Sequence, residues 1–262
     1  MQISIKHNIP EVQAALERAA GQVPFAQMTA LNKTAAKAQE AVRKEMLQVF
    51  DRPTPWVLNS LRIKFATKSN LQAELAFKDK NSAESSASMI EPNVFGGKRH
   101  FKAMEARLLR IGLLPSGWTV VPGAAAQLDA YGNMSRGQIS QLLNVLGTYT
   151  EAGYNKANAA TRARLAKGNV KKNVYGFEYW VNKVGSTKAR HLQPGVYQRV
   201  KTGFGSSLKP ILIFVKLASY KQRLDFFGIA QKTIDKEYAG QFNSAFDEAM
   251  RTALLKSQGS LL

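Results

Sequence analysis

Two long stretches, one toward each end of the chain, repeat apolar residues at intervals of three and four. Because an α-helix turns once every 3.6 residues, this spacing gathers the apolar side chains on one face. We therefore predict long amphipathic helices over residues 24–50 and 225–256, and a separate helix over 10–22 that Pro10 opens. The stripe of the first long helix consists of Phe25, Met28, Leu31, Ala35, Ala38, Val42, Met46 and Val49. That of the second consists of Phe227, Ala230, Ile234, Tyr238, Phe242, Ala245, Ala249 and Ala253.

The residues between these helices alternate mostly as strands do. Pro53 and Pro55 should end the first long helix, because proline removes backbone donors and biases the preceding residue away from the α conformation. Apolar and polar residues then alternate over 61–65 and 71–77, which predicts a hairpin, and again within 174–217. The remaining predicted elements are strands at 2–7 and 118–121 and helices at 82–90, 98–111 and 135–146.

This order of elements predicts an α+β fold. We expect an antiparallel sheet, built from the 61–77 hairpin and the 174–217 strands, with the long N- and C-terminal helices packed over it and a basic arm inserted. Three segments follow from the sequence: 1–154 with the N-terminal helices, hairpin and a helical insertion, the arm at 155–173, and 174–262 with the C-terminal strands and helix. The first and third are expected to form one composite domain.

The charge of the chain is strongly positive. It has 262 residues with 37 Lys and Arg against 18 Asp and Glu, a net charge of +19, and no cysteine. Disulfide frameworks, thiolate chemistry and Cys-containing metal sites are therefore excluded, and a polyanionic partner is indicated. The longest apolar run, 211–215, is too short to span a bilayer, and the opening residues lack the apolar core of a secretory signal. We expect no membrane partner and a protein made in the cytosol.

Most of this charge lies in one region. Residues 152–222 hold 14 Lys and Arg against one acid, Glu178. The apolar-poor part at 155–173 is expected to be a mobile loop that contacts DNA or an acidic partner through its charges, independently of base sequence. Tyr175 and Tyr179 follow it and could stack on bases, although their alternation fits a strand better. The candidate contact residues are Arg162, Arg164, Lys167, Lys171 and Lys172.

No pattern in the chain is typical of a catalytic or metal site. The three histidines, at 7, 100 and 191, have no partner at ligand spacing, and the glycines near 96 and 203 lack the phosphate-loop and nucleophile-elbow spacings. Glu84, Glu91 and Glu105 are not paired as an acid and a base. We therefore expect a protein that is not an enzyme, with no cofactor, no metal and no small-molecule substrate.

Two segments contain turn chemistry in a recognisable order. In the first, 128–139, Gly132 and Asn133 suit a turn with positive φ, and Ser135 can cap the helix that includes Gly137. In the second, 192–199, Pro194 and Gly195 lead into a strand.

These two motifs, with the strand 210–215, the segment 220–226 and the helix 26–50, resemble the minor tail protein Z family of tailed phages and prophages, whose members are tail completion or neck proteins. The resemblance covers most of the chain and departs from the family at 155–173 and 80–127. It implies a structural virion protein, assembled in the host cytoplasm, at the neck or upper tail. There it would form a homo-oligomeric ring around the DNA channel, beside head–tail connector, portal or tail proteins and packaged DNA.

Two other classes remain open on the sequence. One is a sequence-independent DNA-binding protein that acts free in solution, with the steep salt dependence of phosphate binding. The other is a nuclease that uses glutamate and lysine residues. The ring stoichiometry and the tail type are not specified by any residue pattern.

Overall fold

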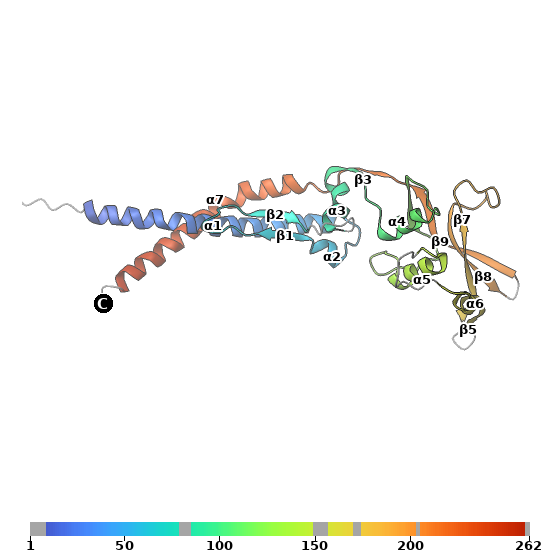
Figure 1. Ribbon diagram of the computed structural model, residues 1–262. Helices are drawn as coiled ribbons and strands as arrows, with labels where there is room; N and C mark the ends of the chain where they lie inside the picture. The colour runs from blue at the N-terminus through green and yellow to red at the C-terminus, as the bar shows by residue number, and fades with distance from the viewer. Residues whose placement is uncertain (1–8, 79–84, 149–156, 170–173, 203–204, 260–262) are drawn as a thin grey trace, which may run out of the picture. The chain divides into compact units, whose positions relative to one another are not determined.

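The computed structural model describes residues 9–78, 85–148, 157–169, 174–202 and 205–259, and the predicted strand at 2–7 lies outside them. The fold is α+β, as predicted. The chain forms two compact units (Figure 1): one combines residues 1–79 with 222–262, and the other is the intervening segment 80–221. We call them the terminal unit and the inserted unit. The division falls at other positions than the predicted boundaries at 154 and 174, and residues 155–173 belong to the inserted unit.

The terminal unit is built on two long helices, α1 (Ile9–Val49) and α7 (Phe226–Gly259), which lie side by side (Figure 1). They run antiparallel, since Lys37 pairs with Glu237 while Arg223 bonds the carbonyl of Val49. Every fourth residue of α1 is buried from Ala26 to Met46, and Ala245 and Ala249 are buried on α7. Alanine occupies five of these positions, and small side chains permit close packing of neighbouring helices.

The predicted break between helices at residues 22–24 is wrong, because α1 continues through Pro24. Proline inside a helix costs one hydrogen bond and a local clash, about 3 kcal/mol. Ala26, two residues after Pro24, is fully buried, so burial of this face of α1 opposes that cost. The predicted end near residue 50 is confirmed. Helix α2 (Pro55–Leu58) follows, capped by the side chain of Thr54.

The predicted hairpin forms from β1 (Leu61–Lys64) and β2 (Glu74–Phe77), but the prediction that it joins the strands of 174–217 in one sheet is wrong. The hairpin is a separate two-stranded sheet beside α1. Asn32 on α1 bonds both the N–H and the carbonyl of Ala66, and Gln39 donates to the carbonyl of Leu61. These helix side chains bond the hairpin to α1, and the hairpin pairs with no further described strand.

The inserted unit contains the larger sheet, with the antiparallel order β4-β9-β8-β7. Its strands are β4 (Trp118–Pro122), β7 (Phe177–Asn182), β8 (Gly195–Thr202) and β9 (Gly205–Lys216). A bulge interrupts the β8–β9 register between Val196 and Tyr197. Strand β9 lies between two neighbours, which agrees with the near-continuous apolar run that predicts a central strand.

Helices cover this sheet. The core joins Leu108 of α4 (Ala103–Arg110) and Leu142 and Leu143 of α5 (Arg136–Leu146) to Val196 and Phe214 of the strands. The unit also contains α3 (Ser86–Phe95), α6 (Ala159–Lys167), and two short pairs, β3 (Gly97–Lys98) with β10 (Ser219–Tyr220) and β5 (Gly168–Asn169) with β6 (Val174–Tyr175). It therefore has its own hydrophobic core.

Candidate functional site

The predicted basic arm contains a helix, so the expectation of a loop is wrong where the structure describes it. Helix α6 spans Ala159–Lys167, and the side chain of Asn158 caps it by accepting from the N–H of Thr161 at 2.7 Å. Five of its nine residues are alanine or leucine in the order AATRARLAK, and these residues have high helix propensity. Scarcity of large apolar residues alone favours a loop, but an alanine-rich segment with an Asn cap favours a helix.

The arm's described cations differ in their contacts. Arg162 donates to the carbonyl of Val145, at 3.2 Å, and so ties α6 to the last turn of α5. Arg164 and Lys167 are exposed in the last turn of α6, where cations interact favourably with the helix dipole. Lys171 and Lys172 lie outside the described residues. Of the predicted contact residues, the structure therefore describes only Arg162, Arg164 and Lys167, all on α6.

The two tyrosines that follow the arm have different environments. Tyr175 is 67% exposed. Tyr179 packs against the core and donates from its hydroxyl to Oε1 of Gln141 at 3.0 Å, and burial raises its pKa to about 12. Tyr179 is therefore a packing residue of the sheet, as its alternation in sequence predicts. Of the two tyrosines, Tyr175 is the one exposed enough to stack on a base.

A cavity of about 530 Å³ lies within the inserted unit between α5, α6 and β7. Leu146, Leu165 and Phe177 supply apolar surface, and Arg162 and Glu178 also line it. Its lining is mostly aliphatic and aromatic, so it offers packing surface without a converging set of polar groups.

The first sequence motif forms a closed turn. The Asp129 carboxylate accepts from the N–H groups of Tyr131 and Asn133, both at 2.9 Å, and Gly132 has φ of 79°. Asn133 does not share that conformation, so the expectation of positive φ is confirmed for Gly132 and wrong for Asn133. Ser135 caps α5 by accepting from Gln138, as predicted, and Gly137 lies inside the first turn of that helix.

The second motif is confirmed as the start of a strand. Pro194 accepts from the N–H of Phe214 at 2.8 Å, and β8 begins at Gly195. A methyl group on Gly195 would overlap the carbonyl oxygen of Leu212 on β9. Glycine is therefore required here for close approach of two strands.

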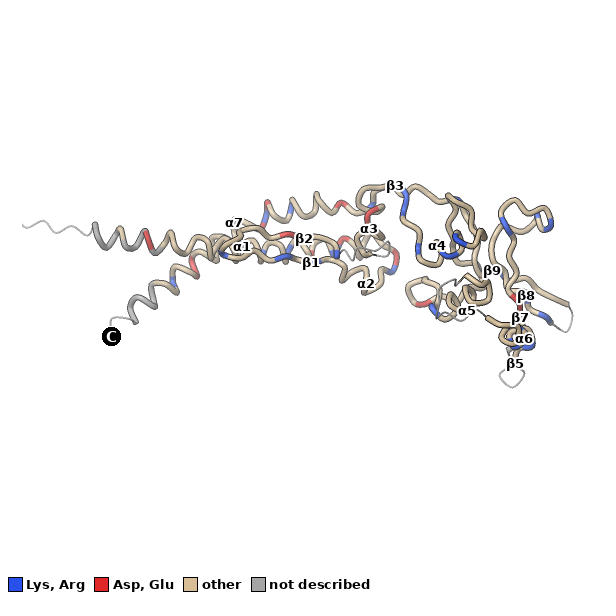
Figure 2. The backbone as a smooth tube through the Cα atoms, in the orientation of Figure 1, with Lys and Arg blue, Asp and Glu red and all other residues tan. Residues whose placement is uncertain are grey.

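Sequence reasoning missed a second basic element, the loop 183–194 between β7 and β8. Figure 2 shows blue segments on this loop, which adjoins β7 in Figure 1. Lys183, Lys188, Arg190 and His191 are exposed on it, and no carboxylate of the described residues is paired with them. The available signal was the absence of any Asp or Glu between Glu178 and Asp225.

The three glutamates considered for catalysis do not form a described acid–base set. Glu84 lies outside the described residues, and Glu91 is exposed, 3.8 Å from Nε2 of His100. Glu105 is fully buried and accepts hydrogen bonds from Arg99, Thr119 and two backbone N–H groups. Within the described ranges, no group of three or more His, Asp or Glu side chains could hold a metal ion.

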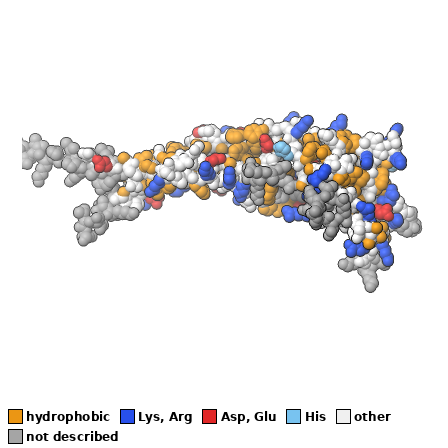
Figure 3. All heavy atoms as spheres, in the orientation of Figure 1, with side chains coloured by type: hydrophobic (Ala, Val, Ile, Leu, Met, Phe, Trp, Pro, Cys, Tyr) orange, Lys and Arg blue, Asp and Glu red, His pale blue; other side chains and the backbone are white. Residues whose placement is uncertain are grey.

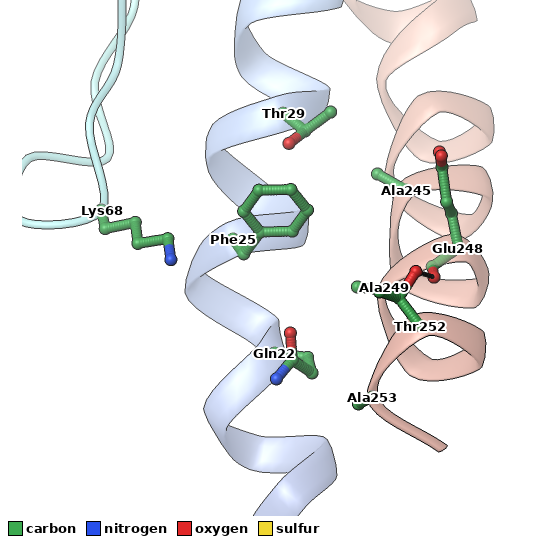
Figure 4. Close-up of a pocket in the computed structure, with 9 residues that line it drawn as sticks. All are labelled: Gln22, Phe25, Thr29, Lys68, Ala245, Glu248, Ala249, Thr252 and Ala253. Atoms are coloured by element: carbon green, nitrogen blue, oxygen red, sulfur yellow. Dashed lines mark hydrogen bonds between the residues drawn. The ribbon is translucent and has the colours of Figure 1, made fainter. Parts of the chain in front are cut away.

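The terminal unit has a groove of about 480 Å³ between α1, α7 and the β1–β2 turn (Figure 4). Phe25 points toward α7, Ala245 and Ala249 face it across the groove, and Lys68 lies with its ammonium 5.3 Å from the Phe25 ring centroid. Glu248 is the one carboxylate among the lining residues described. The groove is therefore a packing feature between helices with no paired acid and base.

Comparisons with protein-family models, curated proteins and solved structures found no match to this chain. Among its described helices, none is both long and apolar enough to cross a membrane.

Proposed function

We propose that this chain is a structural component of a tailed-phage virion, located at the neck or upper tail, where it assembles as a homo-oligomeric ring around the DNA channel. In this role it completes the tail or joins it to the head. The sequence motifs at 128–139 and 192–199 support the proposal through their resemblance to the minor tail protein Z family.

The observation that carries the proposal is the uneven distribution of charge between the two compact units. Residues 80–221 hold 21 Lys and Arg against 6 Asp and Glu, a net charge of +15. The remaining residues hold 16 against 12, a net charge of +4. In the view of Figure 3, Lys and Arg side chains are spread over the visible face of the inserted unit. A unit of this charge is suited to a polyanion such as packaged DNA.

The terminal unit supplies the surface for assembly in this proposal. Several large apolar side chains of its described residues are exposed, each by more than half: Leu47, Trp56, Phe65 and Phe227. These side chains are the candidates for contacts with neighbouring subunits, because interface cores are enriched in aromatic residues. The neighbours in the proposed location are further copies of this chain and connector, portal or tail proteins.

Deletion of the gene from the phage or prophage that encodes it tests this function. We expect lysates with unjoined heads and tails, or particles that have lost DNA, and restoration by the wild-type chain supplied in trans. A variant with Arg162, Arg164, Lys167, Lys171 and Lys172 neutralised should fold and yet complement less well. Normal infectious particles from that variant would exclude the arm as the DNA contact.

The alternative is a sequence-independent DNA-binding protein that acts free in solution. Fully infectious particles without the gene product, together with tight and salt-sensitive DNA binding by a monomer or dimer, would favour it. Metal-dependent nicking of supercoiled plasmid would instead favour a nuclease, if mutation of Glu84, Glu91 or Glu105 abolished it.

A further inference from the structure

The loop between β7 and β8 is held in place by buried side chains. The Asn182 amide donates to the carbonyls of Ala189, Leu192 and Gln193 at 3.3, 3.0 and 3.3 Å. The hydroxyl of Tyr197, a residue only 4% exposed, donates to the carbonyl of Gln193 at 2.8 Å. One side chain from each strand therefore fixes the returning half of the loop.

The outgoing half of the loop is fixed as well. A turn closes from Ser186 N–H to the carbonyl of Lys183 at 3.1 Å, with Gly185 at φ of 79°. Val184 packs against the core of the unit. With its backbone ordered in advance, the loop does not pay that ordering cost when a ligand binds.

What the loop presents outward is polar and basic. Buried Ala189 lies between Lys188 and Arg190, and both cations are exposed, as are Lys183 and His191. Thr187 is exposed beside them, whereas the loop's aliphatic residues face inward in whole or part. Ammonium, guanidinium and hydroxyl groups are the donors that contact phosphate oxygens. The core of a protein–protein interface is instead enriched in aromatic residues and depleted of lysine.

We propose that this loop is the surface through which the chain contacts the phosphate backbone of duplex DNA. The inference rests on the proposed DNA-facing role and assigns it to Lys183, Lys188 and Arg190 more than to α6. In α6, Arg162 is already bonded to the carbonyl of Val145. Contact through phosphates makes the binding independent of base sequence and steeply dependent on salt.

The test is fluorescence anisotropy of the full chain with a short labelled duplex of mixed sequence, over a series of salt concentrations. Lys183→Ala/Lys188→Ala/Arg190→Ala removes the loop charges. Lys33→Ala/Arg43→Ala/Lys44→Ala removes the same charge from exposed positions of α1. We expect the loop variant to lose about tenfold or more in affinity, and its slope of log K against log salt to fall by about 2 to 3. The α1 variant should change affinity less than about twofold.

A charge-preserving exchange, Lys188→Arg with Arg190→Lys, should bind as the wild type does, and thermal melting checks that each variant is folded. Loop and α1 variants of equal affinity would overturn the inference. So would a loop variant that binds DNA normally but no longer binds isolated tails or portal complexes, which would assign the loop to an acidic protein.

These binding measurements, taken with the gene deletion described above, separate this inference from the proposed function. A wild-type chain that binds no duplex even at low salt overturns the loop assignment and leaves the virion role standing. Loop-dependent DNA binding by a chain that is dispensable for infectious particles supports the loop assignment and removes the virion role.

Discussion

At the scale of single residues, Glu105 joins three parts of the inserted unit. Its carboxylate accepts from the backbone N–H of Lys102, which caps α4, from the guanidinium of Arg99 at 2.6 and 2.7 Å, and from Thr119 and Val120 on β4. The side chain of Arg99 is 14% exposed, so the pair is largely removed from water. Breaking such a pair leaves a buried charge without compensation.

We predict that Glu105→Ala lowers the free energy of unfolding by about 3 to 5 kcal/mol. Chemical denaturation of the full chain measures the loss. Glu91→Gln, which changes an exposed carboxylate, should have an effect within about 0.5 kcal/mol. A variant at Glu105 as stable as the Glu91 variant would contradict the role described here.

The same carboxylate predicts a pH dependence. Burial raises the pKa of Glu105, but hydrogen bonds from Arg99, Thr119 and the backbone outweigh it and lower the pKa from 4.5 to about 2. A depressed pKa in the folded state stabilises the protein above the unfolded pKa, and that stability is lost as pH falls toward the folded value. Between about pH 4.5 and 2, the wild type should therefore lose more stability than Glu105→Gln does. Parallel denaturation curves for the two proteins across that range would show that Glu105 does not contribute.

Two glycines of the sequence motifs should respond in opposite directions to alanine. Gly195→Ala brings a methyl group onto the Leu212 carbonyl of the adjacent strand and should cost several kcal/mol, or about 10 °C or more in melting temperature. Gly137→Ala meets no atom within 4 Å, lies inside α5, and should stabilise by about 0.5 to 1 kcal/mol. Thermal melting of both variants tests this, and a neutral Gly195→Ala would contradict the strand geometry.

At the scale of elements, the buried face of α1 contains a polar atom without a hydrogen bond in the described part of the chain, and a substitution can remove the free-energy penalty of burying it. Thr34 is 3% exposed, and its hydroxyl oxygen has no hydrogen-bond partner among the described residues. Thr34→Val keeps the shape and should stabilise the protein by about 1 kcal/mol. Ala30→Leu, at a fully buried position of the same stripe, should destabilise it by about 1 to 3 kcal/mol. Urea titrations distinguish these outcomes, and destabilisation by Thr34→Val would indicate a partner for the hydroxyl.

The elements also show what the sequence could predict. Apolar spacing predicted both long helices, the hairpin and the larger strands, because its period distinguishes a helix from a strand. The buried face of the helices was predicted only in part, since Phe227 and Ile234 of the expected stripe are exposed. It predicted a break at Pro24 where tertiary packing carries the helix on. It could not predict that Asn32 and Gln39 would bond backbone groups of the hairpin, because such contacts join residues distant in sequence.

The candidate site was predicted less completely for the same reason. A run of cations is visible in the sequence, so the basic arm could be predicted, but its helical structure was not predicted. The β7–β8 loop has fewer cations for its length and was missed. What marks it is the buried support from Asn182 and Tyr197, which only the structure reveals.

At the scale of the whole molecule, the chain returns to the terminal unit after an insertion with its own core. We predict that residues 80–221 expressed alone fold cooperatively, since their sheet and covering helices are complete within that range. A sigmoidal thermal transition with dispersed amide NMR signals would confirm this. A fragment without cooperative unfolding would show that the inserted unit depends on the terminal helices.

The central claim is that the protein works as an assembled virion component. The most direct measurement is the mass of the purified chain in solution, alone and mixed with isolated tails or portal complexes of the phage that encodes it. The account predicts a ring-sized oligomer, or a monomer that assembles only on those particles. A monomer or dimer that binds DNA tightly and ignores tails and portals would contradict it.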